Sequence, residues 1–327
     1  MSEREQILEE LRLADKLLLT THENPDGDAL GSLLAMHEIL RLMGKDSIMF
    51  MAGNQFPLPQ EYQHLPFEEV VHEPPADVDE RTVVFLDCGN IDRMPVDFLQ
   101  KPGVHILNID HHHDNTRFGT VNLVEPDASC TAEILYSLAK DLGVEITVPI
   151  AEALYVGLVT DTGKFMFENT TPAAHRMAAE LLEVGVAADQ VHRHLYEGLP
   201  FSRLRLLARA LANVERYEDA GITLTHLTQD DFAAAEADES DSEGIVDHMR
   251  SVENTAVAAL VRELLEPGKQ GQRKVSLRAT DGRVDVSRIA RGLGGGGHRQ
   301  AAGFSSESSI DEITEFVRQE FLASARA

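Results

Sequence analysis

The feature that most constrains the fold is an alternation of short apolar runs with longer amphipathic segments in the first half of the chain. Apolar runs at 16–22, 46–53, 82–89 and 104–112 predict strands, and the segments 29–43, 131–143 and 150–162 predict helices. The runs "TVVFLDCG" and "VHILNIDHH" are nearly continuous, which fits strands covered on both faces in a parallel sheet. The sequence therefore predicts an α/β domain with a doubly wound, mainly parallel sheet.

The second half of the chain predicts a smaller α/β unit. Residues 172–216 read as helical throughout, and strands are predicted at 221–228, 255–264 and 274–280, with a closing helix at 310–325. We expect an N-terminal domain at 1–185, a helical linker at 186–216 and a C-terminal domain at 217–327. The acidic stretch 233–244 is interpreted as a solvated helix and loop.

The charge of the chain excludes one class of function. The 327 residues include 55 acidic and 29 basic side chains, which gives a net charge of −26. A protein that holds long nucleic acid needs a basic track to neutralise many phosphates. We therefore expect no long nucleic acid as partner, although a small anion could be held at one local site. Adaptation of a solvated surface to salt is an alternative reason for the charge.

Other sequence features concern location. The N-terminus "MSEREQILEE" is charged and helix-prone, which is unlike a signal peptide, and no apolar run approaches the length of a membrane span. Cys88 and Cys130 are not spaced as a redox or zinc motif, which favours structural thiols in a reducing compartment. The expectation is a cytoplasmic protein without a membrane partner.

Polar residues cluster where predicted strands end. Carboxylates and imidazoles occur at His22, Asp26, Asp28, Asp87, Asp110, His111, His112 and, after a predicted helix, at Asp161. This donor set, without thiolate, suits manganese, magnesium or iron better than structural zinc. Carboxylates that meet at one sheet edge repel each other unless cations lie between them. Two divalent ions about 3.5–4 Å apart would solve this and could also activate a phosphoryl group.

Five motifs in order identify a family resemblance. The stretches "HENPDGDALGS", "FLDCGN", "DHHHDN", "TDTGKF" and "GGGGHRQAAGF" closely resemble the DHH phosphoesterase superfamily with its DHH-associated C-terminal domain. The resemblance extends over nearly the whole chain. The length is similar to that of the stand-alone NrnA-type nanoRNA hydrolases, which also dephosphorylate pAp.

The resemblance implies a role for each residue of the first four motifs. The metal ligands would be His22, Asp26, Asp28, Asp87, His111 and Asp161, with Asp87 bridging two ions. Asp110 would orient a metal-bound imidazole, and His112 would face the substrate phosphate. Manganese is expected, and magnesium or iron could replace it. Ser129 or Thr131 could contact the substrate, although a helix cap explains them equally well.

The formal charges at the metal site predict that positively charged residues of the second domain bind the substrate. Four ligand aspartates cancel two divalent cations, so a bound hydroxide would leave the site negative. Arg278 on a predicted strand and His298 and Arg299 in the glycine-rich stretch are the candidates, and the amides of Gly296 and Gly297 could approach an anion closely. The resemblance implies that these residues bind the terminal phosphate and nucleotide.

The resemblance implies a manganese-dependent phosphodiesterase that degrades RNA of a few nucleotides to mononucleotides and converts pAp to AMP. Cyclic dinucleotides or linear pApA and pGpG could be the substrates instead. The metal motifs also fit an inorganic pyrophosphatase or polyphosphatase, and a nucleotide-binding scaffold without activity would be a non-enzyme function for the chain. The family often dimerises, so a homodimer is left open.

Overall fold

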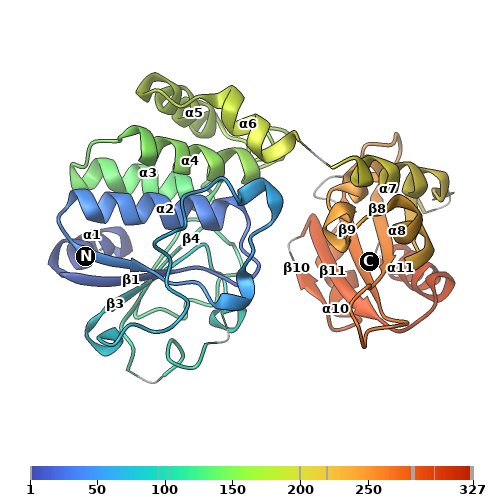
Figure 1. The fold of residues 1–327 in the computed structure, drawn as a ribbon, viewed down its shortest axis with the longest axis horizontal. Coiled ribbons are helices and arrows are strands. Elements are labelled where there is room, and N and C mark those ends of the chain that lie inside the picture. Colours follow the sequence, from blue (N-terminus) through green and yellow to red (C-terminus); the bar gives the residue numbers. More distant parts are fainter. Residues whose placement is uncertain are drawn as a thin grey trace. The chain divides into compact units, whose positions relative to one another are not determined.

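The structure is a computed structural model that describes residues 2–94, 96–101, 103–198, 200–218, 220–280, 284–297 and 299–324. The chain forms two compact units, residues 1–197 and 198–327 (Figure 1). Helix α6 (Ala188–Tyr196) belongs to the first unit and helix α7 (Phe201–Ala212) to the second. The helices expected to form one linker over 186–216 are therefore divided between the two units.

The first unit is built on five parallel strands in the order β2-β1-β3-β4-β5. These strands are β1 (Lys16–Thr20), β2 (Asp46–Met49), β3 (Thr82–Leu86), β4 (Ile106–Asp110) and β5 (Val121–Val124). The order reverses between β1 and β3, and parallel sheets bind ligands outside the carboxyl ends of their strands at such a switch point. The predicted parallel α/β architecture is confirmed.

Helices cover one face of this sheet (Figure 1). They are α1 (Glu3–Leu13), α2 (Gly27–Leu42), α3 (Thr131–Leu142) and α4 (Val148–Asp161), with α5 (Pro172–Val184) and α6 packed outside them. Their apolar side chains meet alternate residues of the strands, such as Leu17 and Leu19 of β1, in one buried core. The period of two along each strand sends Leu18 to the opposite face.

Helices α2 and α4 pack so closely that glycine is required at the contact. A Cβ atom on Gly31 would lie 2.3 Å from the carbonyl oxygen of Ala153, and one on Gly27 would lie 2.4 Å from the Thr160 hydroxyl. These contacts place the first turn of α2 beside the last turn of α4. Two polar ends of helices therefore meet at the carboxyl edge of the sheet.

The opposite face of the sheet is buried by connecting segments. Phe98 packs edge-on against Phe50, and Phe118 packs edge-on against Phe85. The connections include the short 3-10 helices η1 (Gly53–Gln55), η2 (Gln60–Tyr62), η3 (Val78–Glu80) and η4 (Ile91–Arg93). Both faces are thus covered, as the apolar runs indicated, but within the described residues only one is covered by α-helices.

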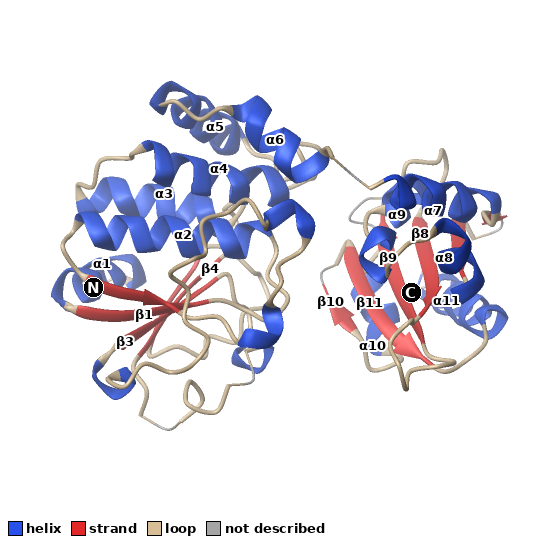
Figure 2. Cartoon of the chain, viewed as in Figure 1, coloured by secondary structure: helices blue, strands red, loops and turns tan. Residues whose placement is uncertain are grey.

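The second unit contains a mixed sheet of six strands in the order β10-β11-β9-β8-β7-β6 (Figure 2). The strands are β6 (Glu215–Tyr217), β7 (Ile222–Leu227), β8 (Val257–Glu263), β9 (Arg273–Ala279), β10 (Gly296–Gly297) and β11 (Ala301–Ser306). The strands β7 and β8 are parallel and the other pairs are antiparallel.

Helices lie on both faces of this second sheet. One core includes side chains of α10 (Val286–Arg291) and α11 (Ile310–Ser324), and the other includes side chains of α7, α8 (Gln229–Ala235) and α9 (Ile245–Arg250). The acidic stretch 233–244 contains the end of α8 and the 3-10 helix η5 (Glu239–Ser242). In the described part of the chain, no helix has both the length and the apolar character that crossing a membrane requires.

Candidate metal centre

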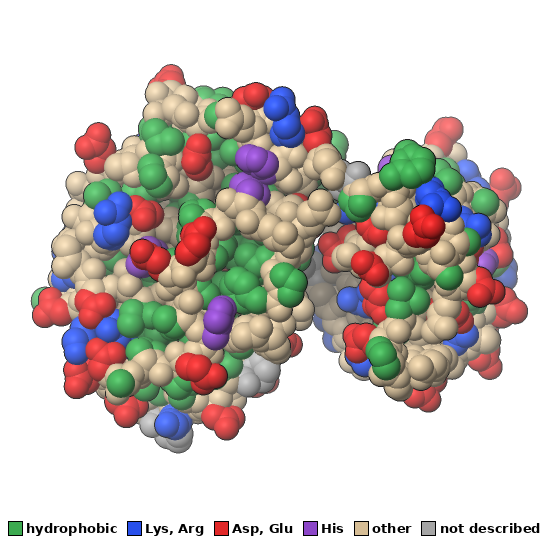
Figure 3. Space-filling model, in the orientation of Figure 1, with side chains coloured by type: hydrophobic (Ala, Val, Ile, Leu, Met, Phe, Trp, Pro, Cys, Tyr) green, Lys and Arg blue, Asp and Glu red, His purple; other side chains and the backbone are tan. Residues whose placement is uncertain are grey.

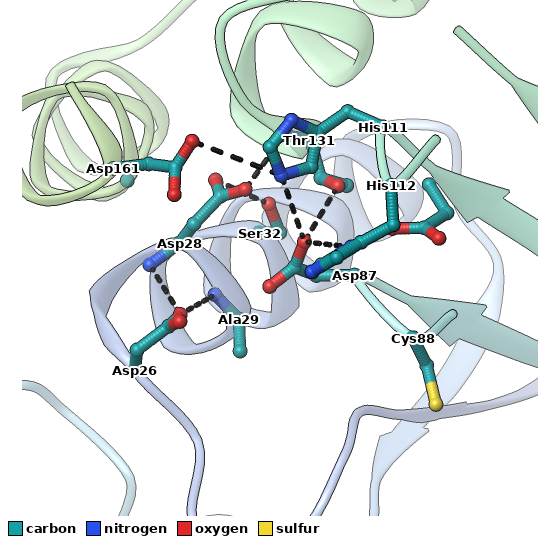
Figure 4. A network of polar contacts seen from close by, with 12 residues as sticks. Asp26, Asp28, Ala29, Ser32, Asp87, Cys88, His111, His112, Thr131 and Asp161 are labelled. Atoms are coloured by element: carbon teal, nitrogen blue, oxygen red, sulfur yellow. Dashed lines mark hydrogen bonds and ion pairs between the residues drawn. The ribbon is translucent and has the colours of Figure 1, made fainter. Parts of the chain in front are cut away.

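Polar side chains from five segments converge at the switch point of the first sheet, and Figure 4 shows those of α2, α4 and the ends of β3 and β4. The segments are the ends of β1, β3 and β4, the first turn of α2 and the last turn of α4. They carry the residues predicted to bind metal ions.

His22 follows β1 and is 2% exposed. Its Nδ1 lies 2.8 Å from the carbonyl oxygen of Glu23, and its Nε2 lies 3.7 Å from Oδ2 of Asp87. An imidazole that donates Nδ1–H to a backbone carbonyl presents the lone pair of Nε2 to a cation. His22 is therefore oriented as a ligand toward Asp87.

The two aspartates of the α2 turn have different surroundings. Asp26 is exposed and caps α2, because its Oδ1 accepts from the amides of Asp28 and Ala29 at 3.1 and 3.0 Å. Asp28 is 1% exposed, and its carboxylate accepts from the amides of Thr131 and Ala132 at 2.6 and 3.0 Å. The N-terminus of α3 thus fixes Asp28, which is favourable for a carboxylate.

Asp87 lies at the middle of the cluster. It follows β3 directly, is 1% exposed and has a φ of 56°, a left-handed conformation that is uncommon outside glycine. The hydroxyl of Thr131 donates to its Oδ1 at 3.0 Å. The same oxygen lies 3.7 Å from Nε2 of His111 and 3.6 Å from Nδ1 of His112.

The end of β4 carries an aspartate and two histidines with distinct contacts. Nδ1 of His112 is 2.7 Å from Oδ1 of Asp110, and Asn115 donates to Oδ2 of Asp110 at 2.5 Å. Asp110 is fully buried behind His112. In the structure Asp110 orients His112, and its role beside a metal-bound imidazole stays a prediction.

Asp161 ends α4 and faces His111. Its Oδ2 lies 3.7 Å from Nε2 of His111 and accepts from the side chain of Asn169 at 3.0 Å. Asn169 also donates to the backbone carbonyls of Asp161 and Ser129, at 3.1 and 2.8 Å. Asn169 therefore ties the last turn of α4 to the segment that precedes α3.

Crowding of carboxylates shifts their pKa values. Burial, followed by the charges of Asp87, Asp161 and Asp26, raises the pKa of Asp28. Burial raises the pKa of Asp161 to about 7, with Asp26 and Asp87 adding to the effect and His111 opposing it. Protonation of these groups relieves their repulsion, and a bound cation would relieve it in the same way.

The histidines affect the central carboxylate in the opposite direction. Burial alone would raise the pKa of Asp87, but His22, His112 and His111 together lower it. Burial likewise lowers the pKa of His112, but the hydrogen bond to Asp110 and the charge of Asp87 raise it by more, to about 9.

The donor geometry fits divalent cations. The site contains two groups of three residues, and within each group the donor atoms lie within 4.8 Å of one another. One group is His22, Asp26 and Asp87, and the other is Asp87, His111 and His112. The three nitrogen–oxygen distances of 3.7 Å, from His22 to Asp87 and from His111 to Asp87 and Asp161, are too long for hydrogen bonds, yet each of these atoms can reach a shared cation at about 2.0–2.2 Å. Asp87 is common to both groups.

Sequence reasoning missed the residues that hold the ligands. Asn115 lies in the quoted "DHHHDN" motif but received no role, and Asn169 lies eight residues after Asp161 without a motif. Thr131, considered as a substrate contact or a helix cap, contacts two aspartates from other segments. No spacing signal predicts such contacts, because they depend on how α3 packs.

The substrate residues predicted in the second unit are partly brought together. Arg278 of β9 pairs in register with Ala301 of β11, directly after the glycine-rich stretch. Gly296 and Gly297 form β10, and Gly297 has a φ of +135°, which side chains rarely adopt. The carbonyl of Arg299 accepts from the amide of Val286 at 2.9 Å. His298 lies outside the described residues.

Both cysteines are buried free thiols. Cys88 donates to the carbonyl of Asn90 at 3.1 Å and its side chain points away from the ligands (Figure 4). Burial raises the pKa of Cys88 to about 12, so the thiol stays protonated and is not a ligand candidate.

Comparisons with known families agree with this site. Residues 16–158 match the family described as "DHH family, N-terminal domain", and residues 227–323 match the "DHHA1 domain". The chain is 34% identical to a bifunctional oligoribonuclease and PAP phosphatase, NrnA, from Thermus thermophilus, over 93% of this chain and 90% of the relative. It is 28% identical to the protein of the same name from Bacillus subtilis, over 92% of each chain.

A solved structure shares the fold across both units. An exopolyphosphatase-related protein from Bacteroides fragilis superposes with a TM-score of 0.85 and 25% identity, over 98% of this chain and 96% of the other.

Proposed function

Because the chain belongs to the DHH family of phosphoesterases, we propose that it hydrolyses RNA of a few nucleotides to mononucleotides and converts pAp to AMP and phosphate. The relatives that support this proposal carry both activities in their names and match along more than nine-tenths of this chain. Its cytoplasmic location, a homodimeric state and the absence of a membrane partner are further parts of the proposal that rest on the sequence.

One structural observation carries the proposal. A buried carboxylate, Asp87, is surrounded by three histidines, and further aspartates face the same point from α2 and α4. Such a cluster holds more negative charge than it can keep without cations, as the raised pKa values of Asp28 and Asp161 indicate. We therefore propose two divalent ions, manganese first, held by His22, Asp26, Asp28, Asp87, His111 and Asp161.

Bound divalent ions supply Lewis-acid activation of a phosphoryl group and of an attacking water. The chain's own residues would orient the substrate around them. Asp110 holds His112 in place and stabilises its protonated form. His112 would then donate a hydrogen bond to a phosphoryl oxygen or a proton to the leaving group.

The second unit would bind the terminal phosphate and nucleotide. The register between β9 and β11 supports this assignment, because it places Arg278 beside the turn that follows Gly296 and Gly297. Arg278 is 31% exposed in its side chain, and its Nε lies 3.8 Å from Oδ1 of Asp247, which an anion would have to compete with. Arg299 and His298 remain proposals from the motif alone.

The charge of the molecule supports a short substrate. Figure 3 shows acidic side chains dispersed over both units, with lysines and arginines in small groups among them. A body with a net charge of −26 repels a long polyanion, whereas a short one meets only the local site.

The proposal is tested with purified protein and a panel of substrates. Short oligoribonucleotides, pAp, pApA and cyclic di-AMP are each incubated with and without Mn²⁺, and mononucleotide and phosphate release are measured. We expect release from short RNA and pAp only with the metal. Turnover confined to cyclic di-AMP or pApA would assign a dinucleotide phosphodiesterase function instead.

A second candidate is favoured by one comparison. The Bacteroides fragilis structure is named as exopolyphosphatase-related, so the same assay includes polyphosphate and pyrophosphate as substrates. Phosphate release from either of them that exceeds release from pAp would select this second function.

A further inference from the structure

An arginine that the motifs did not predict lies against the metal centre. Arg93 ends η4, six residues after Asp87, and is half-buried. Its Nη2 lies 3.0 Å from Nδ1 of His22. Its backbone carbonyl accepts from the amide of Glu23 at 2.7 Å, so the main chain fixes Arg93 beside the His22 loop.

Two groups compete for the same nitrogen of His22. Nδ1 is 2.8 Å from the carbonyl oxygen of Glu23 and 3.0 Å from the guanidinium of Arg93. A ring nitrogen can donate to the carbonyl or accept from the guanidinium, but not both at once. If His22 binds a cation through Nε2, its proton is on Nδ1 and goes to Glu23. The guanidinium then has no acceptor in His22.

The positive charge of Arg93 is not balanced by a carboxylate in the part of the chain that the structure describes. Across the residues that the structure describes, no carboxylate forms an ion pair with Arg93. An arginine side chain stays protonated and offers five N–H donors in a planar fork, which matches the geometry of phosphate oxygens. A guanidinium that is released beside a proposed metal ligand is therefore available to bind an anion next to the metal centre.

The formal charge of the metal centre explains why an additional positive charge is needed there. The four ligand aspartates cancel two divalent cations, so a phosphoryl group needs a further positive charge close by. Sequence reasoning assigned that charge to the second unit. Arg93, in direct contact with His22, could supply it within the first unit.

We propose that Arg93 binds the phosphoryl group of the substrate at the metal centre, and that metal binding to His22 makes its guanidinium available. This inference rests on the proposed function for its substrate, but not for its anion site. Arg93 would bind the phosphoryl group that reacts, whereas Arg278 would bind the terminal phosphate and nucleotide of the substrate.

The test compares Arg93→Gln, which removes the charge, with Arg93→Lys, which keeps it but loses the fork. The control is Arg41→Gln, an exposed arginine of α2 that pairs with Glu38. Three quantities are measured on the full chain: Mn²⁺ affinity by calorimetry, the affinity of the Mn²⁺-loaded protein for inorganic phosphate, and KM and kcat for pAp.

We expect Arg93→Gln to bind Mn²⁺ as the wild type does, because Glu23 still accepts from His22. Its affinity for phosphate should fall roughly tenfold to a hundredfold, the effect of losing a hydrogen bond to a charged group. KM for pAp should rise by a similar factor. The phosphate affinity and the KM of Arg93→Lys should lie between those of the wild type and Arg93→Gln. Arg41→Gln should match the wild type in both.

The outcomes separate this inference from the proposed function. Unchanged phosphate affinity in Arg93→Gln, loss of Mn²⁺ binding in that variant, or a wild type that binds no phosphate would each overturn the role of Arg93. If phosphate binding depends on Arg93 while the wild type cleaves neither short RNA nor pAp, the proposed function fails and the anion site stands.

Discussion

At the scale of single residues, Asp87 combines burial at the middle of the site with a left-handed backbone conformation. A left-handed φ outside glycine costs on the order of 1–3 kcal/mol and persists only where the surroundings enforce it. Here the Thr131 hydroxyl donates to the carboxylate, and three imidazoles lie 3.6–3.7 Å from it. The strain is at the one residue shared by both donor groups, which is consistent with a bridging role.

Thr131 provides a prediction about metal affinity. Replacing Thr131 by valine removes the hydroxyl that donates to Asp87 but keeps the amide that donates to Asp28. Groups that orient metal ligands typically contribute about tenfold to a hundredfold in affinity, so Thr131→Val should bind Mn²⁺ about tenfold more weakly in calorimetry.

The matched control is Thr131→Ser, which retains the hydroxyl. It should restore most of the affinity. Equal Mn²⁺ affinity in Thr131→Val and the wild type would show that the hydroxyl does not position Asp87.

The pKa of Asp161 predicts the response to pH. The pKa of Asp161 is raised from 3.8 to about 7. Between pH 3.8 and about pH 7, therefore, the folded metal-free protein holds a proton on Asp161 that the unfolded chain has released. Its contribution to stability is therefore largest at low pH and is lost as pH rises through about 7. Metal must displace that proton, so Mn²⁺ affinity should fall about tenfold per pH unit below 7.

Thermal unfolding with and without Mn²⁺ checks both parts. The rise in Tm on adding Mn²⁺ should be larger above pH 7 than below it. The metal-free Asp161→Asn variant should be more stable than the metal-free wild type above pH 7. An equal Tm of the two metal-free proteins above pH 7 would refute the shift.

At the scale of elements, the packing of α2 on α4 positions the ligands. A Cβ atom on Gly157 would lie 2.7 Å from Oδ1 of Asp28 and 2.8 Å from Cβ of Ala132. Gly157→Ala should thus lower stability by about 1–3 kcal/mol through overpacking and should also weaken Mn²⁺ binding. Urea unfolding and calorimetry measure the two effects.

Two glycine variants separate packing from the site. Gly31→Ala strains the same helix pair against the backbone of Ala153 and Gly157 and does not meet the Asp28 carboxylate directly, so it should lower stability with a smaller loss of Mn²⁺ affinity than Gly157→Ala. Gly53→Ala meets only the His72 side chain, at 3.8 Å, and should change neither. Wild-type metal affinity in Gly157→Ala would show that α4 does not position Asp28.

Elements differ in how far the sequence predicts them. The strands β1, β3 and β4 were predicted because buried parallel strands are apolar at nearly every position. The strand β5 was missed, because its four residues are mostly half-buried and lack that run. The strands β10 and β11 were missed, because glycine and alanine give no strand signal and only pairing with β9 defines them.

The same distinction applies to the site. Residues that follow strands, such as His22 and Asp87, could be predicted to meet because parallel strands end at one edge. The contacts of Arg93, Asn169 and Thr131 could not, because each depends on the packing of loops and helices that leaves no periodic pattern.

At the scale of the whole molecule, charge should select substrate length. A net charge of −26 disfavours a long single strand, so kcat/KM for a dinucleotide should exceed that for a long RNA at low salt. Added salt screens the repulsion and should reduce the ratio. Equal cleavage of long and short RNA at low salt would contradict this account of the charge.

The central claim is that metal ions held around Asp87 hydrolyse short RNA. The direct test is mononucleotide release from a dinucleotide by the wild type and by Asp87→Asn. Both proteins are assayed at the Mn²⁺ concentration that saturates the wild type, and the metal bound to each is measured. We predict Mn²⁺-dependent release by the wild type, and loss of both bound metal and release in Asp87→Asn. Wild-type release by Asp87→Asn, or release that needs no divalent metal, would contradict the claim.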